Sequence, residues 1–539
     1  MDTVDYIIVG GGTAGCIVAN RLSANNRNQV LLLEAGGSDR RFWIRVPIGY
    51  GRTFNDPAVN WMYEAEPDAA LDGVRSFWPR GKVLGGSGSI NAMVYVRGQP
   101  GDFDNWRALG NVGWGWSDVL PHFRAIESRA SGAGEGTATH GPMRVTDVSA
   151  AAHPLVGAYI KGCAELGFKF TPDFNGVQSE GVGVYQISTR NGFRESTATA
   201  FLRPALARQN LQLALRSQVL RIDFEGRRAV GVTYERAGQT QSVRARRAVI
   251  LAAGSINSPQ LLQLSGVGPG ALLQGHGIAT VQDLSAVGRN LQDHLAVSYF
   301  YRSRVPTLNN QLYPLLGKIR AGVQYVLTRS GPLSMSVNQG GGFIRSDPQL
   351  RAPDLQFYFN PASYTQTRVR TRRLMNPDPF PGFLLGFNSC RPTSRGHLAI
   401  RSSDPKAQPV IFPNYLSTEQ DLHDVQVGTR LMRRLAATKP LAAMIDHEML
   451  PGAAKMTDAE LLQDFRERAG TVFHPVSTCM MGADPASSVV DARLRVHGIA
   501  GLRVIDASIF PTLTSGNTNA PTAMVAEKGA AMAIADENG

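Results

Sequence analysis

The sequence has few cysteines and does not group them. Its 539 residues include four, Cys16, Cys163, Cys390 and Cys479, which lie far apart and form neither a CxxC pair nor a Cys/His spacing suited to a metal ion. A chain of this length can bury a core large enough to fold without disulfides or structural metal. We therefore expect no metal site, and we exclude a small cross-linked scaffold.

Long hydrophobic runs are also missing. No apolar run approaches the ~20 residues that cross a bilayer, and the nearest candidates are short segments such as Ala248–Ala253. A strand-like run begins at Val4, with no basic segment, apolar segment or cleavage site ahead of it. We therefore expect a cytoplasmic protein that does not cross a membrane.

Acidic residues are outnumbered, 43 against 55 Lys and Arg, which gives a formal net charge of +12. Residues 301–400 contain thirteen Lys or Arg and three Asp, and so carry most of this excess. No recognition motif accompanies the charge, so we exclude nucleic acid as a partner. Two interpretations stay open: a solvated basic face, or docking of Arg368–Arg373 on the anionic inner face of the cell membrane, where a quinone acceptor would reside.

The hydrophobic pattern indicates an interrupted α/β domain. Val4–Val9 and Gln29–Leu33 are predicted strands on either side of a helix over Thr13–Ser23, which makes a βαβ unit. Two further core strands are predicted at Arg247–Ala252 and Leu502–Ile505. Between about 295 and 465 the pattern changes to alternating strands and amphipathic helices, which indicates an inserted substrate domain; the segments are Leu355–Phe359, Phe383–Phe387, His397–Ile400, Glu419–Ala436 and Asp458–Ala469.

A dinucleotide-binding motif follows the first predicted strand. Gly10, Gly12 and Gly15 have the GxGxxG spacing and open the first helix, and the acidic Glu34 ends the next strand. The glycines permit a tight turn and close approach of a pyrophosphate to the helix N-terminus, and the acid suits a ribose hydroxyl. This motif alone does not distinguish NAD from FAD.

Two longer motifs carry a family resemblance. Residues 81–93, GKVLGGSGSINAM, with Gly98 and Asp104, resemble the first signature of the glucose–methanol–choline (GMC) oxidoreductase family, and residues 254–268, GSINSPQLLQLSGVG, resemble the second. Segments 287–294, 474–475 and 506–511 match in the same order, so the resemblance covers essentially the whole chain. It is strongest to the alcohol and choline dehydrogenase branch.

The resemblance implies an FAD-dependent, two-domain α/β (α+β) protein. A discontinuous Rossmann-like FAD-binding domain would comprise residues 1–147, 196–292 and 466–539. The substrate domain, with a mostly antiparallel sheet flanked by helices, would comprise 148–195 and 293–465. Some relatives attach FAD through a histidine at the position of Ile90, so we expect the flavin here to be non-covalent. The resemblance also implies cofactor contacts by Thr13, Ala14, Ala35, Leu84, Gly85, Gly86, Asn91, Ala92, Met93, Val94, Val219, Ala253, Ala507 and Thr518.

Alcohol oxidation needs a base, because hydride leaves carbon readily only when the hydroxyl proton is lost, and imidazole suits this role near neutral pH. His474 and Asn517 resemble the family's catalytic His/Asn pair. Phe473 and Trp61 are candidates to line the substrate side of the flavin. His294 is interpreted as a buried histidine bonded to backbone near the domain junction, outside the catalytic set.

The substrate expected is a neutral primary alcohol, aliphatic or aromatic, or a polyol or sugar. Choline-oxidising relatives carry a glutamate that pairs with the quaternary ammonium where this sequence has Ala296, and an unpaired cation in a closed cavity is costly. We expect the product to be the aldehyde and the acceptor a quinone, a redox protein or another acceptor that is not oxygen. The alternatives are an oxygen-using alcohol oxidase, a choline dehydrogenase and, more remotely, a flavin photoenzyme acting on fatty acids.

Overall fold

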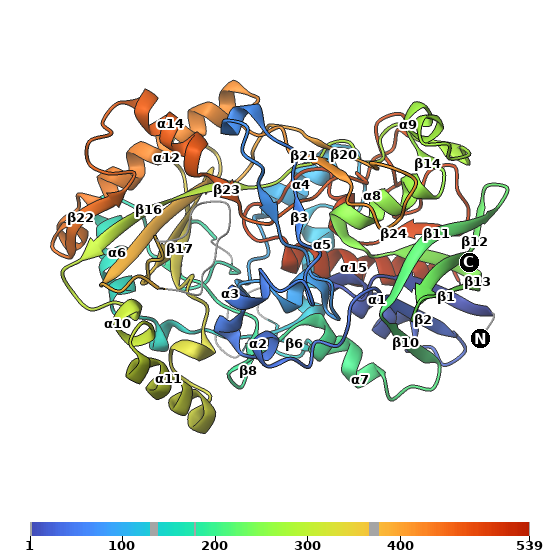
Figure 1. Ribbon diagram of the computed structural model, residues 1–539, viewed down its shortest axis with the longest axis horizontal. Coiled ribbons are helices and arrows are strands. Elements are labelled where there is room, and N and C mark those ends of the chain that lie inside the picture. The colour runs from blue at the N-terminus through green and yellow to red at the C-terminus, as the bar shows by residue number, and fades with distance from the viewer. Residues whose placement is uncertain (1–2, 130–137, 177–178, 366–376, 538–539) are drawn as a thin grey trace.

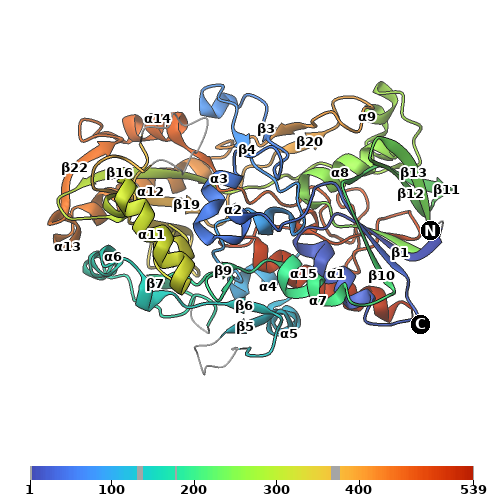
Figure 2. The ribbon, with the colours of Figure 1, turned by 60° about the horizontal axis from the view of Figure 1, so that its bottom comes forward.

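The computed structural model describes residues 3–129, 138–176, 179–365 and 377–537. Two large sheets lie toward opposite ends of the molecule, the first on the right of Figure 1 and the second on the left. Both chain ends lie beside the first sheet in Figures 1 and 2. The predicted α/β architecture with two sheets is confirmed.

The first sheet is built from the start, middle and end of the chain. Its strand order is β10 (Leu211–Leu215), β2 (Val30–Glu34), β1 (Thr3–Val9), β13 (Gln239–Leu251), β12 (Arg228–Arg236) and β11 (Ser217–Glu225), with β24 (Leu502–Val504) also paired to β13. The strands β10, β2, β1, β13 and β24 pair in parallel. All of β2 and nearly all of β1 are buried, as parallel strands covered on both faces should be.

Helices cover this sheet and bring two helix starts together. Helix α1 (Thr13–Leu22) packs against α15 (Asn519–Ala535), which in turn packs against α5 (Trp116–Ile126). A hydrogen bond of 2.8 Å from the Thr13 hydroxyl to Asn519 Oδ1 joins the starts of α1 and α15.

Strand β13 begins at Gln239, eight residues before the predicted start at Arg247. The prediction missed these residues because the first half of the strand carries mostly exposed side chains and no hydrophobic run.

The second sheet is antiparallel throughout its described pairings. Its order is β22 (Ile445–Leu450), β16 (Leu295–Ser303), β19 (Gly382–Ser389), β18 (Leu355–Asn360), β17 (Gly340–Ile344) and β7 (Gly181–Val184), with β23 (Gly470–Thr471) on β16. Helices α12 (Glu419–Ala436), α14 (Asp458–Arg468) and α6 (Leu155–Glu165) pack on β19, β16 and β17 respectively. This is the predicted antiparallel sheet flanked by helices. Because β23 belongs to it, this sheet extends past the predicted boundary at 465.

The remaining elements are helices and short strands that belong to neither of the two large sheets. No helix in the described part of the chain is both long and apolar enough to span a membrane. These elements are α2 (Phe42–Arg45), α3 (Tyr50–Thr53), β3 (Tyr63–Glu64), β4 (Phe77–Trp78), α4 (Pro100–Ala108), β5 (Glu127–Arg129), β6 (Met143–Val145), β8 (Thr189–Arg190), β9 (Phe193–Arg194), α7 (Arg203–Ala205), α8 (Gly254–Leu264), β14 (Val267–Gly268), α9 (Gly270–Gly275), β15 (Gln282–Asp283), α10 (Leu308–Leu312), α11 (Leu315–Thr328), β20 (His397–Ala399), β21 (Val410–Phe412) and α13 (Lys439–Ala442).

Candidate active site

The turn between β1 and α1 has the geometry of an anion-binding site. Gly10 has φ +102°, and a Cβ there would lie 2.6 Å from the Ala252 carbonyl oxygen, so only glycine fits. Gly12 is the N-cap of α1 and supplies no capping side chain. The first backbone N–H groups of α1 are therefore available to a negatively charged group such as a pyrophosphate.

Glu34 lies at the end of β2 beside this turn. Its two carboxylate oxygens accept hydrogen bonds from the backbone N–H groups of Gly11, at 2.8 Å, and Gly36, at 2.7 Å. Burial raises the pKa of Glu34 to about 7. The carboxyl lines the same cavity as Gly12, at the position expected for an acceptor of a ribose hydroxyl.

A second glycine loop packs directly on the first. Gly86 has φ +55°, and a Cβ there would lie 2.7 Å from Gly12 Cα, while the Gly85 N–H donates to the Gly11 carbonyl at 2.7 Å. Gly15 is needed for close packing in the same way, since a Cβ at this position would lie 1.8 Å from the Gly10 carbonyl oxygen.

One cavity collects most of the residues that the sequence nominated. Gly15, Leu84 and Gly85 are not among its lining residues. The nominated residues that do line it are Gly10, Gly12, Thr13, Ala14, Glu34, Ala35, Trp61, Gly86, Asn91, Ala92, Met93, Val94, Val219, Ala253, Phe473, His474, Ala507, Asn517 and Thr518. The uncapped start of α1, the glycine backbone and the acid at the end of β2 therefore share one cavity with the His/Asn pair, which fits a dinucleotide whose reactive end reaches His474.

His474 and Asn517 meet in this cavity. Asn517 Nδ2 lies 3.1 Å from His474 Nε2, although the two residues come from segments 43 positions apart. His474 is 7% exposed, and burial, followed by the neighbouring His294 and Arg80, lowers its pKa well below 6.5. The imidazole is therefore neutral near pH 7 and available as a base.

His294 touches the candidate base, which sequence reasoning did not foresee. Its Nδ1 lies 3.0 Å from His474 Nδ1, and its Nε2 lies 3.0 Å from the Cys390 carbonyl oxygen. The prediction of a buried histidine bonded to backbone is confirmed, since His294 is fully buried. The contact with His474 could not be read from the sequence, because 180 residues separate the two rings.

These contacts select one tautomer of His474. The Cys390 carbonyl can only accept, so His294 Nε2 carries a proton and its Nδ1 is free to accept. The Asn517 amide nitrogen can only donate, so His474 Nε2 carries the lone pair. His474 Nδ1 then holds the proton and donates it to His294, and the basic nitrogen faces Asn517.

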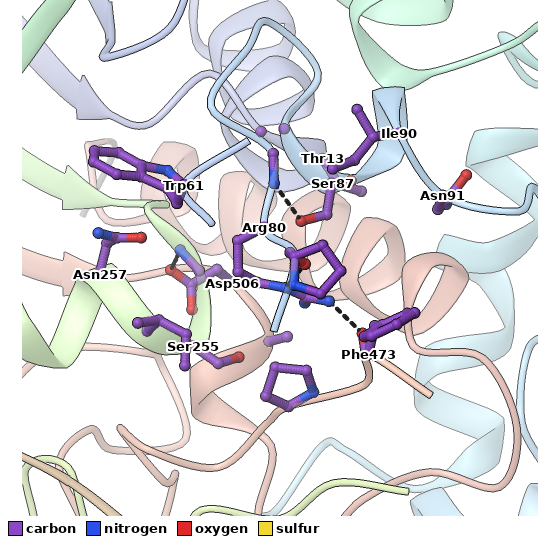
Figure 3. Close-up of a pocket in the computed structure, with 18 of the residues that line it drawn as sticks. Thr13, Trp61, Arg80, Ser87, Ile90, Asn91, Ser255, Asn257, Phe473 and Asp506 are labelled. Carbon is purple, nitrogen blue, oxygen red and sulfur yellow. Dashed lines mark hydrogen bonds between the residues drawn. The ribbon is translucent and has the colours of Figure 1, made fainter. Parts of the chain in front are cut away.

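Asp293 and Arg80 hold the backbone around His474, and neither residue was nominated from the sequence. Asp293 accepts from the His474 backbone N–H at 2.7 Å and from the Tyr415 hydroxyl at 2.6 Å; burial raises the pKa of Asp293 to about 6. Arg80 donates to the Phe473 carbonyl at 2.7 Å, as Figure 3 shows, and burial lowers its pKa to about 10. The sequence signals were the position of Asp293 within the matched segment 287–294 and that of Arg80 directly before the first signature.

The two aromatic candidates lie apart. Phe473 adjoins His474 and contacts Phe54 edge to face, with 5.3 Å between ring centroids. Trp61 lies across Arg80 from Phe473 in Figure 3, and it stacks on Tyr63 at 5.8 Å. Phe473 is therefore next to the catalytic pair, and Trp61 lines another part of the same cavity.

Comparisons with known proteins agree with this geometry. Family models described as GMC oxidoreductase match residues 4–296 and 392–526. The chain is 40% identical over 534 residues to an alcohol dehydrogenase [acceptor] of Pseudomonas putida, covering 98% of this chain and 95% of that one. It is 42% identical over 531 residues to an oxygen-dependent choline dehydrogenase of Vibrio vulnificus, covering 98% and 93%.

Solved structures agree as well. A pyridoxine 4-oxidase from Mesorbium loti superposes with a TM-score of 0.89 at 30% identity over 98% of both chains. A formate oxidase superposes with a TM-score of 0.93 at 26% identity over 100% of this chain and 99% of that one. The chain therefore belongs to the GMC oxidoreductase family, whose members are flavoenzymes, and FAD is its cofactor.

Proposed function

We propose that this protein is an alcohol dehydrogenase that oxidises neutral primary alcohols to aldehydes, with His474 as the base. The observation that carries the proposal is the contact of 3.1 Å between Asn517 Nδ2 and His474 Nε2 in the cavity that the glycine loops also line. Bound FAD would supply the hydride acceptor, its flavin N5.

His474 would take the hydroxyl proton of the alcohol at Nε2. The His294 contact favours the tautomer with its lone pair on that nitrogen, so the base needs no change of tautomer before it acts. The alcohol hydroxyl would replace the Asn517 amide as the partner of that lone pair. Asn517 would direct its amide N–H to the alcohol oxygen, because an amide can bind that oxygen without competing for its proton. Its Oδ1, which is buried and lacks a protein partner, offers a further polar contact to substrate.

The wall beside His474 supports an apolar substrate. Tyr50, Phe54, Val337 and Phe473 line the cavity, and all but Val337 are aromatic. Such a wall excludes water from the reacting carbon and favours aliphatic or aromatic alcohols over polyols and sugars.

Choline is the second candidate, because choline dehydrogenases are among the relatives. The carboxylates among the described lining residues are Glu34 and Asp506, and both are engaged by backbone N–H groups. Arg80 adds a positive charge near His474. A quaternary ammonium would therefore lack a counter-charge, which disfavours choline. Ala296 lies within β16 and is not among the lining residues. The missing counter-charge is therefore a property of the cavity wall and not of position 296.

The mode of flavin attachment and the electron acceptor complete the proposal. Ile90 lines the cavity, and its aliphatic side chain has no atom that could bond to the flavin, so we propose that FAD is held non-covalently. Acid precipitation should then release all the flavin into the supernatant. We further propose that a quinone or a redox protein reoxidises the flavin in preference to oxygen.

Anaerobic mixing with alcohols tests the proposal, with the flavin absorbance at about 450 nm as the readout. The sharpest pair of substrates is choline and 3,3-dimethylbutan-1-ol, which have nearly the same shape and differ in the cationic nitrogen. We expect the neutral alcohol to reduce the flavin faster. Faster reduction by choline would overturn the substrate class, and a His474→Ala variant reduced at the wild-type rate would overturn the mechanism. Reoxidation by a soluble quinone and by oxygen would then identify the acceptor.

A further inference from the structure

Helix α11 carries an apolar stripe that faces away from the protein. Only two of its side chains, Ala321 and Tyr325, are buried against the fold. Figures 1 and 2 both show the helix on the outside of the molecule. The stripe, called the α11 stripe below, consists of side chains that are 53% to 80% exposed: Leu315, Leu316, Ile319, Val323, Val326 and Leu327.

The arrangement of the α11 stripe is regular. At about 100° per residue its six side chains fall within an arc of about 120°. Lys318 and Arg320 lie at its two edges. Neither α11 nor the preceding α10 contains an acidic residue. Soluble proteins seldom expose a contiguous apolar surface without a partner to cover it, so this stripe indicates a binding surface.

We propose that α11 lies in the surface of an anionic lipid membrane, with the α11 stripe among the acyl chains and Lys318 and Arg320 at the headgroups. An apolar face edged by basic residues is the pattern of helices that lie in the plane of a membrane. The helix has 14 residues and is therefore about 21 Å long, too short to cross a hydrocarbon core of about 30 Å.

Charge favours a membrane over a second copy of this chain. A symmetric contact through the α11 stripe would bring the basic edges of two helices together, with no carboxylate on either helix to pair with them. An anionic bilayer would compensate the same charges. The proposal does not depend on Arg368–Arg373, the basic segment that the sequence suggested, because that segment lies outside the described residues.

The position of α11 gives the surface a functional consequence. The chain continues from α11 through a short turn at Pro332–Ser334 to Val337 and Asn338, which line the cavity. The Val337 N–H donates to the Tyr50 hydroxyl at 3.3 Å, which joins this segment to the aromatic wall. A membrane bound by α11 would therefore lie next to the wall of the cavity, where an apolar alcohol or a quinone dissolved in lipid could reach it.

Vesicle flotation of the full-length, flavin-loaded protein tests the proposal. The vesicles are phosphatidylcholine alone and phosphatidylcholine with about one third phosphatidylglycerol. We expect binding to the anionic vesicles that weakens with salt, and at least about a tenfold lower partition coefficient for the triple variant Leu316→Ser, Val323→Ser and Leu327→Ser. The variant Lys318→Gln with Arg320→Gln should reduce binding to anionic vesicles only. The control is Val112→Ser, whose side chain is 80% exposed outside α11.

Three outcomes would overturn the proposal: no flotation of the wild type, flotation of the triple variant equal to the wild type, or equal loss in the control. A lipid-free dimer that the triple variant converts to a monomer would assign the α11 stripe to a second copy instead. Flavin reduction by a water-soluble alcohol should be unchanged in the triple variant. This readout separates failure of the membrane proposal from failure of the proposed function.

Discussion

Replacing His294 with phenylalanine tests whether this residue positions the base. The ring volume is approximately kept, but His474 Nδ1 loses the acceptor that lies 3.0 Å away. A buried donor left without a partner costs about 1–3 kcal/mol, and here the cost falls on the tautomer that carries the reactive lone pair. At 1.36 kcal/mol per tenfold change in rate, flavin reduction should slow by about 5-fold to 150-fold.

The pH profile provides a readout that a merely structural role would not change. His294 is one of the causes that keep the pKa of His474 well below 6.5, so removing it should raise that pKa. A base works only when it is deprotonated, and activity is lost as the pH falls through its pKa. The acidic limb of the reduction rate should therefore move to higher pH in His294→Phe.

Stopped-flow reduction under anaerobic conditions separates the two effects. The limiting rate should fall and the apparent alcohol Kd should change little, because His294 does not line the cavity. His294→Gln should retain most of the rate, since its amide oxygen can accept from His474 Nδ1. His397→Phe, a histidine in β20 that does not line the cavity, is the matched control. A wild-type rate and pH profile in His294→Phe would refute the reasoning.

Three further predictions concern the cofactor loop and two buried charges. Gly86→Ala places a Cβ 2.7 Å from backbone of the facing glycine loop, so the purified variant should contain little FAD, measured as the ratio of flavin to protein absorbance. The pKa of Asp293 is about 6 in the folded protein, against its ordinary value of 3.8. Between these two pH values the native state therefore binds a proton that the unfolded chain has lost, and the free energy of unfolding falls as the pH rises. Asp293→Asn should remove about 2 kcal/mol of that fall between pH 4 and 7, measured by urea unfolding; an unchanged pH slope would contradict the assignment. Arg97→Met removes an ion-pair partner of the fully buried Glu127. Because Arg129 still contacts that carboxylate, the free energy of unfolding should fall by an amount near the low end of about 3–5 kcal/mol. A loss within error of zero would show that the pair contributes nothing to stability.

Much of the fold could be predicted because its signals are local. The buried runs of β1 and β2, the glycine turn between them and the acid at Glu34 all lie within the first 34 residues. The amphipathic α12 matches its predicted bounds, Glu419–Ala436. The first half of β13 was not predicted, because its exposed polar side chains carry no hydrophobic signal.

The same distinction applies to the candidate site: single residues could be predicted from local motifs, whereas contacts between distant residues could not. His474 and Asn517 could be nominated from motifs, since each motif is a short contiguous segment. Their contact with each other, and the contact of His474 with His294, depend on how distant segments pack. Trp61 was nominated with Phe473, but folding separates the two by placing Arg80 between them.

The sequence by itself determined the dinucleotide turn, the identity of the candidate base and the concentration of positive charge in residues 301–400. Only the tertiary structure decided which nitrogen of His474 is basic, because the partners that select its tautomer come from other elements. It also decided that the apolar stripe of α11 faces outward. A periodic pattern shows that a helix has an apolar side, but packing against the rest of the chain decides whether that side is buried.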